Sequence, residues 1–139
     1  MRGTLMPLNR FWKESCMKAD VEKLVKVIGE LGTSGMPIIV EGPRDRKALL
    51  ELGITQEVIV LNTGRRVIQT CEYIASRRYR KVVILTDYDE SGGKLAGMLK
   101  ANLRTMGIRY DLEYRKRIFM LALGVRCVED LPGFIRRHL

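Results

Sequence analysis

The chain has 139 residues, of which 46% are hydrophobic and 29% charged, and this balance predicts one globular domain with a modest core. Its 25 Lys and Arg exceed its 16 Asp and Glu, and the net charge of +9 favours a polyanionic partner such as nucleic acid, although a merely basic surface gives the same count. The longest apolar run, residues 118–125, is far short of the roughly 20 residues of a membrane span, and the three widely spaced cysteines predict reduced thiols in a cytoplasmic protein.

The first predicted element is an amphipathic helix over about residues 9–31. Its apolar residues recur at steps of three and four, which is the spacing of one helix face. They are Met17, Val21, Leu24, Val25, Ile28 and Leu31. Turn residues at 32–35 end the helix. We therefore expect residues 1–35 to form a helix that packs on a domain made of residues 36–139.

Strands and helices alternate through that domain. Short apolar runs predict strands at 36–42, 57–61, 81–85 and 108–114. Helices are predicted between and after them at 43–52, 65–78, 91–107, 115–124 and 128–139, with Pro43 at the first helical position of one and Ser91 as the cap of another. Because the strands are uniformly apolar, both faces of the sheet should be covered. The prediction is an α/β fold with a mostly parallel four-stranded sheet flanked by helices.

Acidic residues follow two of these strands. Glu41 ends the first, and Asp87 and Asp89 follow the third, so three carboxylates meet at one sheet edge if the two strands are neighbours. Such carboxylates raise one another's pKa unless a cation is present, and Mg²⁺ prefers hard oxygen ligands. The pattern favours a Mg²⁺ site, although Asp and Gly after a strand are also ordinary turn residues and Asp87 could cap the next helix. Glu129 and Asp130 either add a distant acid or begin the C-terminal helix.

Basic residues follow the same strand ends. Arg44 comes shortly after Glu41, and Lys94 follows two glycines near the acidic pair. Arg65 and Arg66 follow the loop after the second strand. We favour phosphate binding for these four cations over solvated charge, because this topology places them beside the acidic edge and beside helix N-termini.

Two stretches, "IIVEGPRDRKAL" and "VVILTDYDESGGKLA", together resemble the motifs of the Toprim domain family. The resemblance covers about residues 36–114 and implies a three-layer, Rossmann-like fold. This domain is the catalytic module of topoisomerases, bacterial primases and several nucleases. Within the family, the chain looks like the small stand-alone Toprim proteins, and its motifs lean toward the ribonuclease that matures 5S ribosomal RNA.

The resemblance also implies roles for single residues. Glu41 matches the family's glutamate, a metal ligand and proposed general acid or base, while Asp87 and Asp89 match its metal-binding pair. Other matched positions are Gly42, Asp45, Gly64 and Gly92. The implied cofactor is Mg²⁺, with Mn²⁺ as a substitute.

These observations predict a Mg²⁺-dependent protein that acts on phosphodiester bonds of nucleic acid, RNA or DNA, as a nuclease or phosphotransfer enzyme. Two alternatives stay open. One is a non-catalytic module that binds nucleic acid or recruits a partner. The weaker one is a phosphatase of the haloacid dehalogenase type, whose Asp-x-Asp motif follows the first strand rather than the third.

Overall fold

The computed structural model describes the backbone of residues 2–139 and the side chains of residues 16–139. Helices and strands alternate from β1 to β4, as predicted. In chain order the elements are α1 (Arg2–Ser34), β1 (Ile38–Val40), α2 (Pro43–Glu51), β2 (Val58–Val60), α3 (Val67–Ser76), β3 (Lys81–Ile84), α4 (Glu90–Thr105), β4 (Arg109–Asp111), α5 (Glu113–Leu121), the short 3₁₀ helix η1 (Val128–Asp130) and α6 (Leu131–His138).

The four strands form one sheet in the order β2-β1-β3-β4, and every neighbouring pair is parallel. β1 and β3 are neighbours at the centre: Ile38 pairs with Val83 and Ile39 with Ile84. The mostly parallel sheet predicted from the sequence is therefore confirmed, and it is parallel throughout. Convergence of the acidic residues was predicted on the condition that the first and third strands are neighbours, and β1 and β3 are neighbours.

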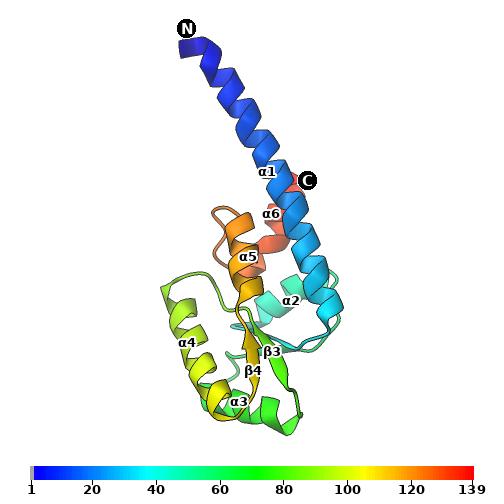
Figure 1. Cartoon of the computed structure of the whole chain (residues 1–139), viewed down its shortest axis with the longest axis vertical. Coiled ribbons are helices and arrows are strands. Elements are labelled where there is room, and N and C mark those ends of the chain that lie inside the picture. The colour runs from blue at the N-terminus through cyan, green and yellow to red at the C-terminus, as the bar shows by residue number, and fades with distance from the viewer. Residues whose placement is uncertain (1) are drawn as a thin grey trace.

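Helices cover both faces of the sheet (Figure 1). Successive side chains of a strand point to opposite faces, and those of the central strands are apolar on both, so each face needs a covering layer. Ile38, Val40 and Val83 pack into a core with residues of α1, α2, α5 and α6. Ile39 and Ile84 point the other way, into a second core with α3 and α4. The result is the three-layer arrangement that the resemblance implied.

One apolar stripe of α1 belongs to the first core. Val21, Leu24 and Ile28 are buried there, and the helix contacts α5 and α6. Val25, which was predicted on the same face, is 42% exposed, because one residue turns the side chain by roughly 100° away from Leu24. α1 also continues to Ser34, beyond its predicted end. None of the helices in the described part of the chain is long and apolar enough to cross a membrane.

Two of the element boundaries that differ from prediction do so because side chains bond to the backbone there. α4 is capped by Asp89 and not by Ser91, since Asp89 Oδ1 accepts a hydrogen bond from the Gly92 N–H at 2.7 Å. The fourth strand stops at Asp111, whose Oδ1 accepts a hydrogen bond from the Tyr114 N–H at 3.0 Å in the first turn of α5.

Candidate functional site

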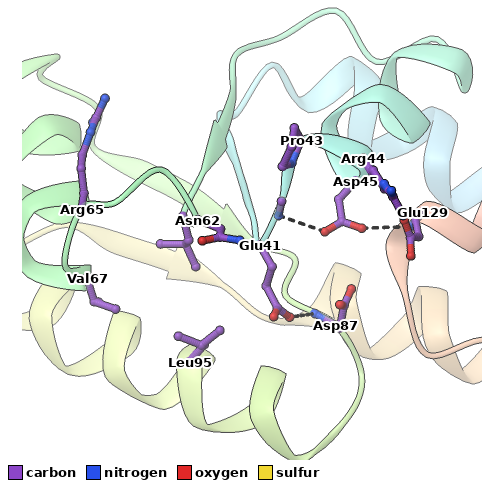
Figure 2. A pocket seen from close by; sticks show the side chains of 12 residues that line it. Glu41, Pro43, Arg44, Asp45, Asn62, Arg65, Val67, Asp87, Leu95 and Glu129 are labelled. Atoms are coloured by element: carbon purple, nitrogen blue, oxygen red, sulfur yellow. Dashed lines mark hydrogen bonds between the residues drawn. The ribbon is translucent and has the colours of Figure 1, made fainter.

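Glu41 and Asp87, two of the three acidic residues predicted to converge, meet at the carboxyl edge of the sheet (Figure 2), while Asp89 caps α4. Glu41 follows β1, and Asp87 follows β3 in the turn before α4. Glu41 Oε2 accepts a hydrogen bond from the backbone N–H of Asp87 at 2.6 Å. After β1 the chain turns to α2 on one face of the sheet, and after β3 it turns to α4 on the other. The two residues therefore lie at a topological switch point, where ligands bind in open α/β sheets.

A pocket of about 550 Å³ opens at this edge, a size typical of small-ligand sites. The loop after β1, the loop after β2 and α4 contribute to its wall. Its charged lining residues are the acids Glu41, Asp45, Asp87 and Glu129 and the cations Arg44 and Arg65 (Figure 2).

Asp87 is a half-buried carboxylate surrounded by other acids. Its pKa is raised to about 6, first by burial and then by the charges of Asp45, Glu41 and Asp89. The Val128 N–H donates a hydrogen bond to Asp87 Oδ1 at 3.2 Å, which works in the opposite direction. The ionised form of Asp87 is thus destabilised by its surroundings, and a cation placed among these oxygens would relieve it.

Asp45 is buried and connects two separate segments. Its Oδ2 accepts a hydrogen bond from the Gly42 N–H at 3.1 Å, and its Oδ1 accepts one from the Glu129 N–H at 3.0 Å. Burial raises the pKa of Asp45, and these two hydrogen bonds oppose the rise. Asp45 therefore ties the start of α2 to η1, a tertiary contact beyond its predicted place in the first turn of a helix.

Gly92 shapes the turn between β3 and α4. A Cβ atom at this position would lie 1.8 Å from the carbonyl oxygen of Asp87, so only glycine fits. The buried Thr86 hydroxyl donates a hydrogen bond to the Gly92 carbonyl at 2.8 Å from the other side of the turn. The glycine that follows the Asp pair in the motif is thus required by close contact between two backbone segments.

The turn after β2 lies beside Glu41. The Asn62 N–H donates a hydrogen bond to the Glu41 carbonyl at 2.8 Å, and Asn62 lines the pocket. Gly64, two residues later, has φ of 80°, a left-handed conformation that favours glycine. The proximity of this turn to the site agrees with what the resemblance implied for Gly64.

Arg115 of α5 contacts the acidic turn but was missed in the sequence. Its Nε donates a hydrogen bond to the Thr86 carbonyl at 2.9 Å, and its Nη2 donates one to the Asp87 carbonyl at 2.7 Å. The guanidinium also lies 4.9 Å from the ring centre of Tyr88. No local pattern signals this role, because only tertiary packing brings α5 to the turn.

Segment 126–130 completes the site and was also missed. The N–H groups of Val128 and Glu129 donate to Asp87 and Asp45, and the Arg126 carbonyl accepts a hydrogen bond from the Tyr88 N–H at 2.6 Å. The sequence offered Glu129 only as a distant acid or the start of a helix. In the structure the Glu129 N–H bonds to Asp45, and a backbone donor cannot be recognised from residue type. Glu129 also lines the pocket.

The three cysteines are free in the structure: Cys71 is buried and Cys16 exposed. Cys127 is half-buried near the acidic residues, and burial followed by the charge of Asp87 raises its pKa to about 11. Cys127 is therefore a neutral thiol at neutral pH.

The three predicted metal ligands each keep one oxygen without a hydrogen bond from the described residues: Glu41 Oε1, Asp87 Oδ2 and Asp89 Oδ2. Within that same part of the chain, no three Asp, Glu, His or Cys side chains are already gathered so as to hold a metal ion. A shared ion would therefore require these carboxylates to turn toward one another, and Glu41 could contribute Oε1 while Oε2 keeps the Asp87 N–H.

The four predicted phosphate-binding cations are placed differently. Arg44 and Arg65 line the acidic pocket, while Arg66 and Lys94 are exposed outside it. Lys94 pairs with Glu90 at 3.6 Å, one turn earlier on α4. The structure thus brings two of the four cations to the acids.

A model of the Toprim domain matches residues 37–121, which include both strand ends and the acidic turn. The chain belongs to the Toprim domain family. Its narrower resemblance to the 5S ribosomal RNA maturase stays a prediction.

Similar curated proteins carry the name UPF0292 protein. The relative from Methanocaldococcus jannaschii is 32% identical over 121 residues, 85% of this chain and 94% of that protein. The one from Thermococcus onnurineus is 42% identical over 115 residues, 82% of this chain and 84% of the relative. A solved structure from Aquifex aeolicus is 28% identical with a TM-score of 0.66, and the match covers 76% of this chain and 94% of that one. Family and fold therefore agree.

Proposed function

We propose that this Toprim protein binds a divalent cation, Mg²⁺ with Mn²⁺ as a substitute, and acts on phosphodiester bonds of nucleic acid. The main support is that Glu41 and Asp87 meet from two strands, with the charge of Asp87 destabilised by burial and nearby acids. Mg²⁺ needs only one or two carboxylates besides water and phosphate oxygens. Glu41 and Asp87 satisfy that need, and Asp89 lies in the same turn.

Each neighbouring residue has a role in this proposal. A bound Mg²⁺ would neutralise charge on a phosphoryl group and lower the pKa of a water molecule. Glu41, through its free Oε1, would accept or return a proton. Arg44 and Arg65 would hold phosphate oxygens at the pocket, since guanidinium groups match their geometry. Arg115 would keep the Asp87 backbone in place.

The second candidate function is a non-catalytic Toprim module that binds nucleic acid or recruits a partner. The observation in its favour is that Asp87 and Asp89 each use one oxygen, and Asp45 uses both, to accept backbone N–H groups, so these acids also hold the local fold together. The dehalogenase-type phosphatase is not carried further, because the chain belongs to the Toprim family.

A cleavage assay separates the two candidates. The purified protein is incubated with Mg²⁺ or Mn²⁺ and labelled single-stranded, double-stranded and hairpin RNA and DNA, with structured RNA first because of the motif resemblance. Asp87→Asn and Glu41→Gln are run beside Asp20→Asn and Glu22→Gln, matched changes on α1 away from the pocket. Cleavage that fails only in the first two variants supports the enzyme. Salt-sensitive binding without cleavage supports the module, and neither binding nor cleavage contradicts both.

Metal binding has its own measurement. Titration calorimetry with MgCl₂ and MnCl₂ should give one or more sites in wild type and in Asp20→Asn, and a loss of heat in Asp87→Asn. Equal heats in wild type and Asp87→Asn would contradict the assignment of Asp87 as a ligand, whatever the cleavage result.

A further inference from the structure

A second groove lies between α4 and α5, on the side of α4 away from the acidic pocket. Its volume is about 390 Å³. Gly93, Ala96 and Gly97 line it from α4, whereas Leu95 of the same helix lines the acidic pocket. Tyr88 lines the groove from the acidic turn, so the two cavities adjoin the same turn.

The glycines of this groove have no role in packing the chain. A Cβ atom at Gly93 or at Gly97 would meet nothing within 4 Å, and neither residue has a positive φ. Glycine inside a helix is destabilising relative to alanine. Since neither packing nor backbone conformation requires these glycines, they keep the α4 side of the groove low and open.

The groove is also basic. Lys100, Arg115 and Lys116 line it, against the single acid Glu113 among the lining residues. Within the described part of the chain, Lys100 and Lys116 form no ion pair with a carboxylate. Two uncompensated ammonium groups on either side of a groove are complementary to a chain of phosphates.

Tyr88 provides an aromatic surface between the two cavities. It stacks on Phe119 with ring centres 5.3 Å apart, the Arg115 guanidinium lies 4.9 Å from its ring centre, and the residue is still 41% exposed. It stands between Asp87 and Asp89 in the sequence, and its ring lines the groove whereas Asp87 lines the acidic pocket. Exposed aromatic rings beside cations are the surfaces on which unpaired bases stack.

Lys94 is exposed on the surface of α4, between the residues that line the two cavities. At roughly 100° per residue, Leu95 falls on one side of it and Gly97 on the other. A strand that crosses the first turns of α4 from the acidic pocket therefore passes Lys94 before it reaches the groove.

We propose that the α4–α5 groove holds a single-stranded segment of nucleic acid that continues from the acidic pocket. Lys100 and Lys116 contact its phosphates, and an unpaired base lies against Tyr88. The inference rests on the proposed function, because it takes the same class of substrate. A single strand is specified because the groove places cations beside an exposed aromatic ring, which a base can contact only when it is unpaired.

The test measures binding without cleavage. Fluorescence anisotropy in EDTA follows a fluorescein-labelled single-stranded RNA, its DNA counterpart and the matching duplexes over a salt series. The variant K100Q/K116Q removes two groove charges, and K23Q/K26Q removes two charges from α1 as the matched control. Gly97→Leu fills the groove without changing charge, and leucine is the better helix former, so its thermal midpoint should equal or exceed that of wild type.

For single strands, K100Q/K116Q should bind about tenfold more weakly, and its slope of log affinity against log salt should fall by about 1.4, roughly 0.7 for each lost phosphate contact. Gly97→Leu should weaken binding comparably, and K23Q/K26Q should match wild type. Oligonucleotide binding that is equal in all variants, or equal losses for duplex and single strand, would overturn the groove and leave the proposed function intact. No binding of any oligonucleotide by wild type in EDTA would overturn the groove, while the cleavage assay with Mg²⁺ decides the proposed function separately.

Discussion

At Gly92 the backbone entering α4 approaches the Asp87 carbonyl so closely that a Cβ atom would lie 1.8 Å away. A new Cβ is fixed to the backbone of residue 92, and the atom it would meet is the backbone carbonyl oxygen of Asp87. Neither can move away without shifting the acidic turn. Gly92→Ala should therefore lower the free energy of unfolding by roughly 3 kcal/mol, measured by urea denaturation. Gly93→Ala is the matched control, and it should stabilise by about 0.5–1 kcal/mol because its Cβ meets nothing. Equal effects at both positions would contradict this geometry.

Arg115 supports the same turn by two donors on one planar group, to the carbonyls of Thr86 and Asp87. A lysine keeps the charge but cannot reproduce both bonds. Arg115→Lys should cost about 1–2 kcal/mol of unfolding free energy in chemical denaturation.

The control is Arg117→Lys, one half-turn along α5. Arg117 pairs with Glu30 at 3.3 Å on the surface, and such a pair should change stability by less than about 0.5 kcal/mol. If the two variants lose the same stability, the Arg115 hydrogen bonds do not hold the turn.

At the scale of elements, Glu57 joins three segments at the edge of the sheet opposite the acidic site. It precedes β2, and its carboxylate accepts hydrogen bonds from the hydroxyls of Tyr73 on α3 and Tyr79 in the next turn. Burial would raise the pKa of Glu57, but the two hydroxyls and the charge of Arg77 outweigh it, so the pKa is lowered. The carboxylate form is thus stabilised by folding.

A group whose pKa is lower in the folded state stabilises the protein above its unfolded pKa and loses that effect as pH falls through the folded value. Glu57→Gln should therefore cost about 1–2 kcal/mol at pH 7, and the difference from wild type should shrink as the pH falls below 4.5, the ordinary pKa of a glutamate. Denaturation curves from neutral pH into acid provide the measurement. Glu72→Gln, an exposed change on α3, should show no such trend, and a Glu57→Gln loss that stays constant with pH would contradict the assignment.

Most elements were predictable because their signals are local. The runs "PIIV" and "VVIL" are apolar throughout, which indicates strands buried on both faces, and Pro43 begins α2 as its fixed φ favours. Errors arose where a side chain competed with the expected pattern. Asp89 replaced Ser91 as a cap because a carboxylate accepts the Gly92 N–H well, and Asp111 ended the fourth strand early for the same kind of reason.

For the whole molecule, the sequence predicted the meeting of Glu41 and Asp87 because both motifs sit at ends of strands that a parallel sheet brings together. It did not predict Arg115, or the N–H groups of Val128 and Glu129. These groups reach the site because α5 and η1 pack in the first core. In addition, every residue except proline has a backbone N–H, so residue type does not reveal which N–H groups bond to the acids. Local motifs therefore located the acids, while the residues that hold them required the fold.

Removing the charge of Asp87 should change the stability of the whole protein, with a sign that depends on whether divalent cation is present. In metal-free buffer at neutral pH, Asp87 carries a half-buried charge close to three other acids. Asp87→Asn removes that charge, and the amide oxygen can still accept the Val128 N–H, so the variant should be more stable than wild type by about 1 kcal/mol.

Adding a divalent cation should make wild type more stable than Asp87→Asn. Mg²⁺ at ten times its dissociation constant stabilises the folded protein that binds it by about 1.4 kcal/mol, and Asp87→Asn should lose this gain. Thermal unfolding with EDTA and with MgCl₂ measures both effects, and Asp20→Asn should follow wild type in each. A variant that is less stable than wild type in EDTA, or that rises with MgCl₂ as wild type does, would mean that Asp87 serves as a structural acceptor alone. In that case the carboxyl edge of the sheet would be architecture, and the non-catalytic candidate would be the one to pursue.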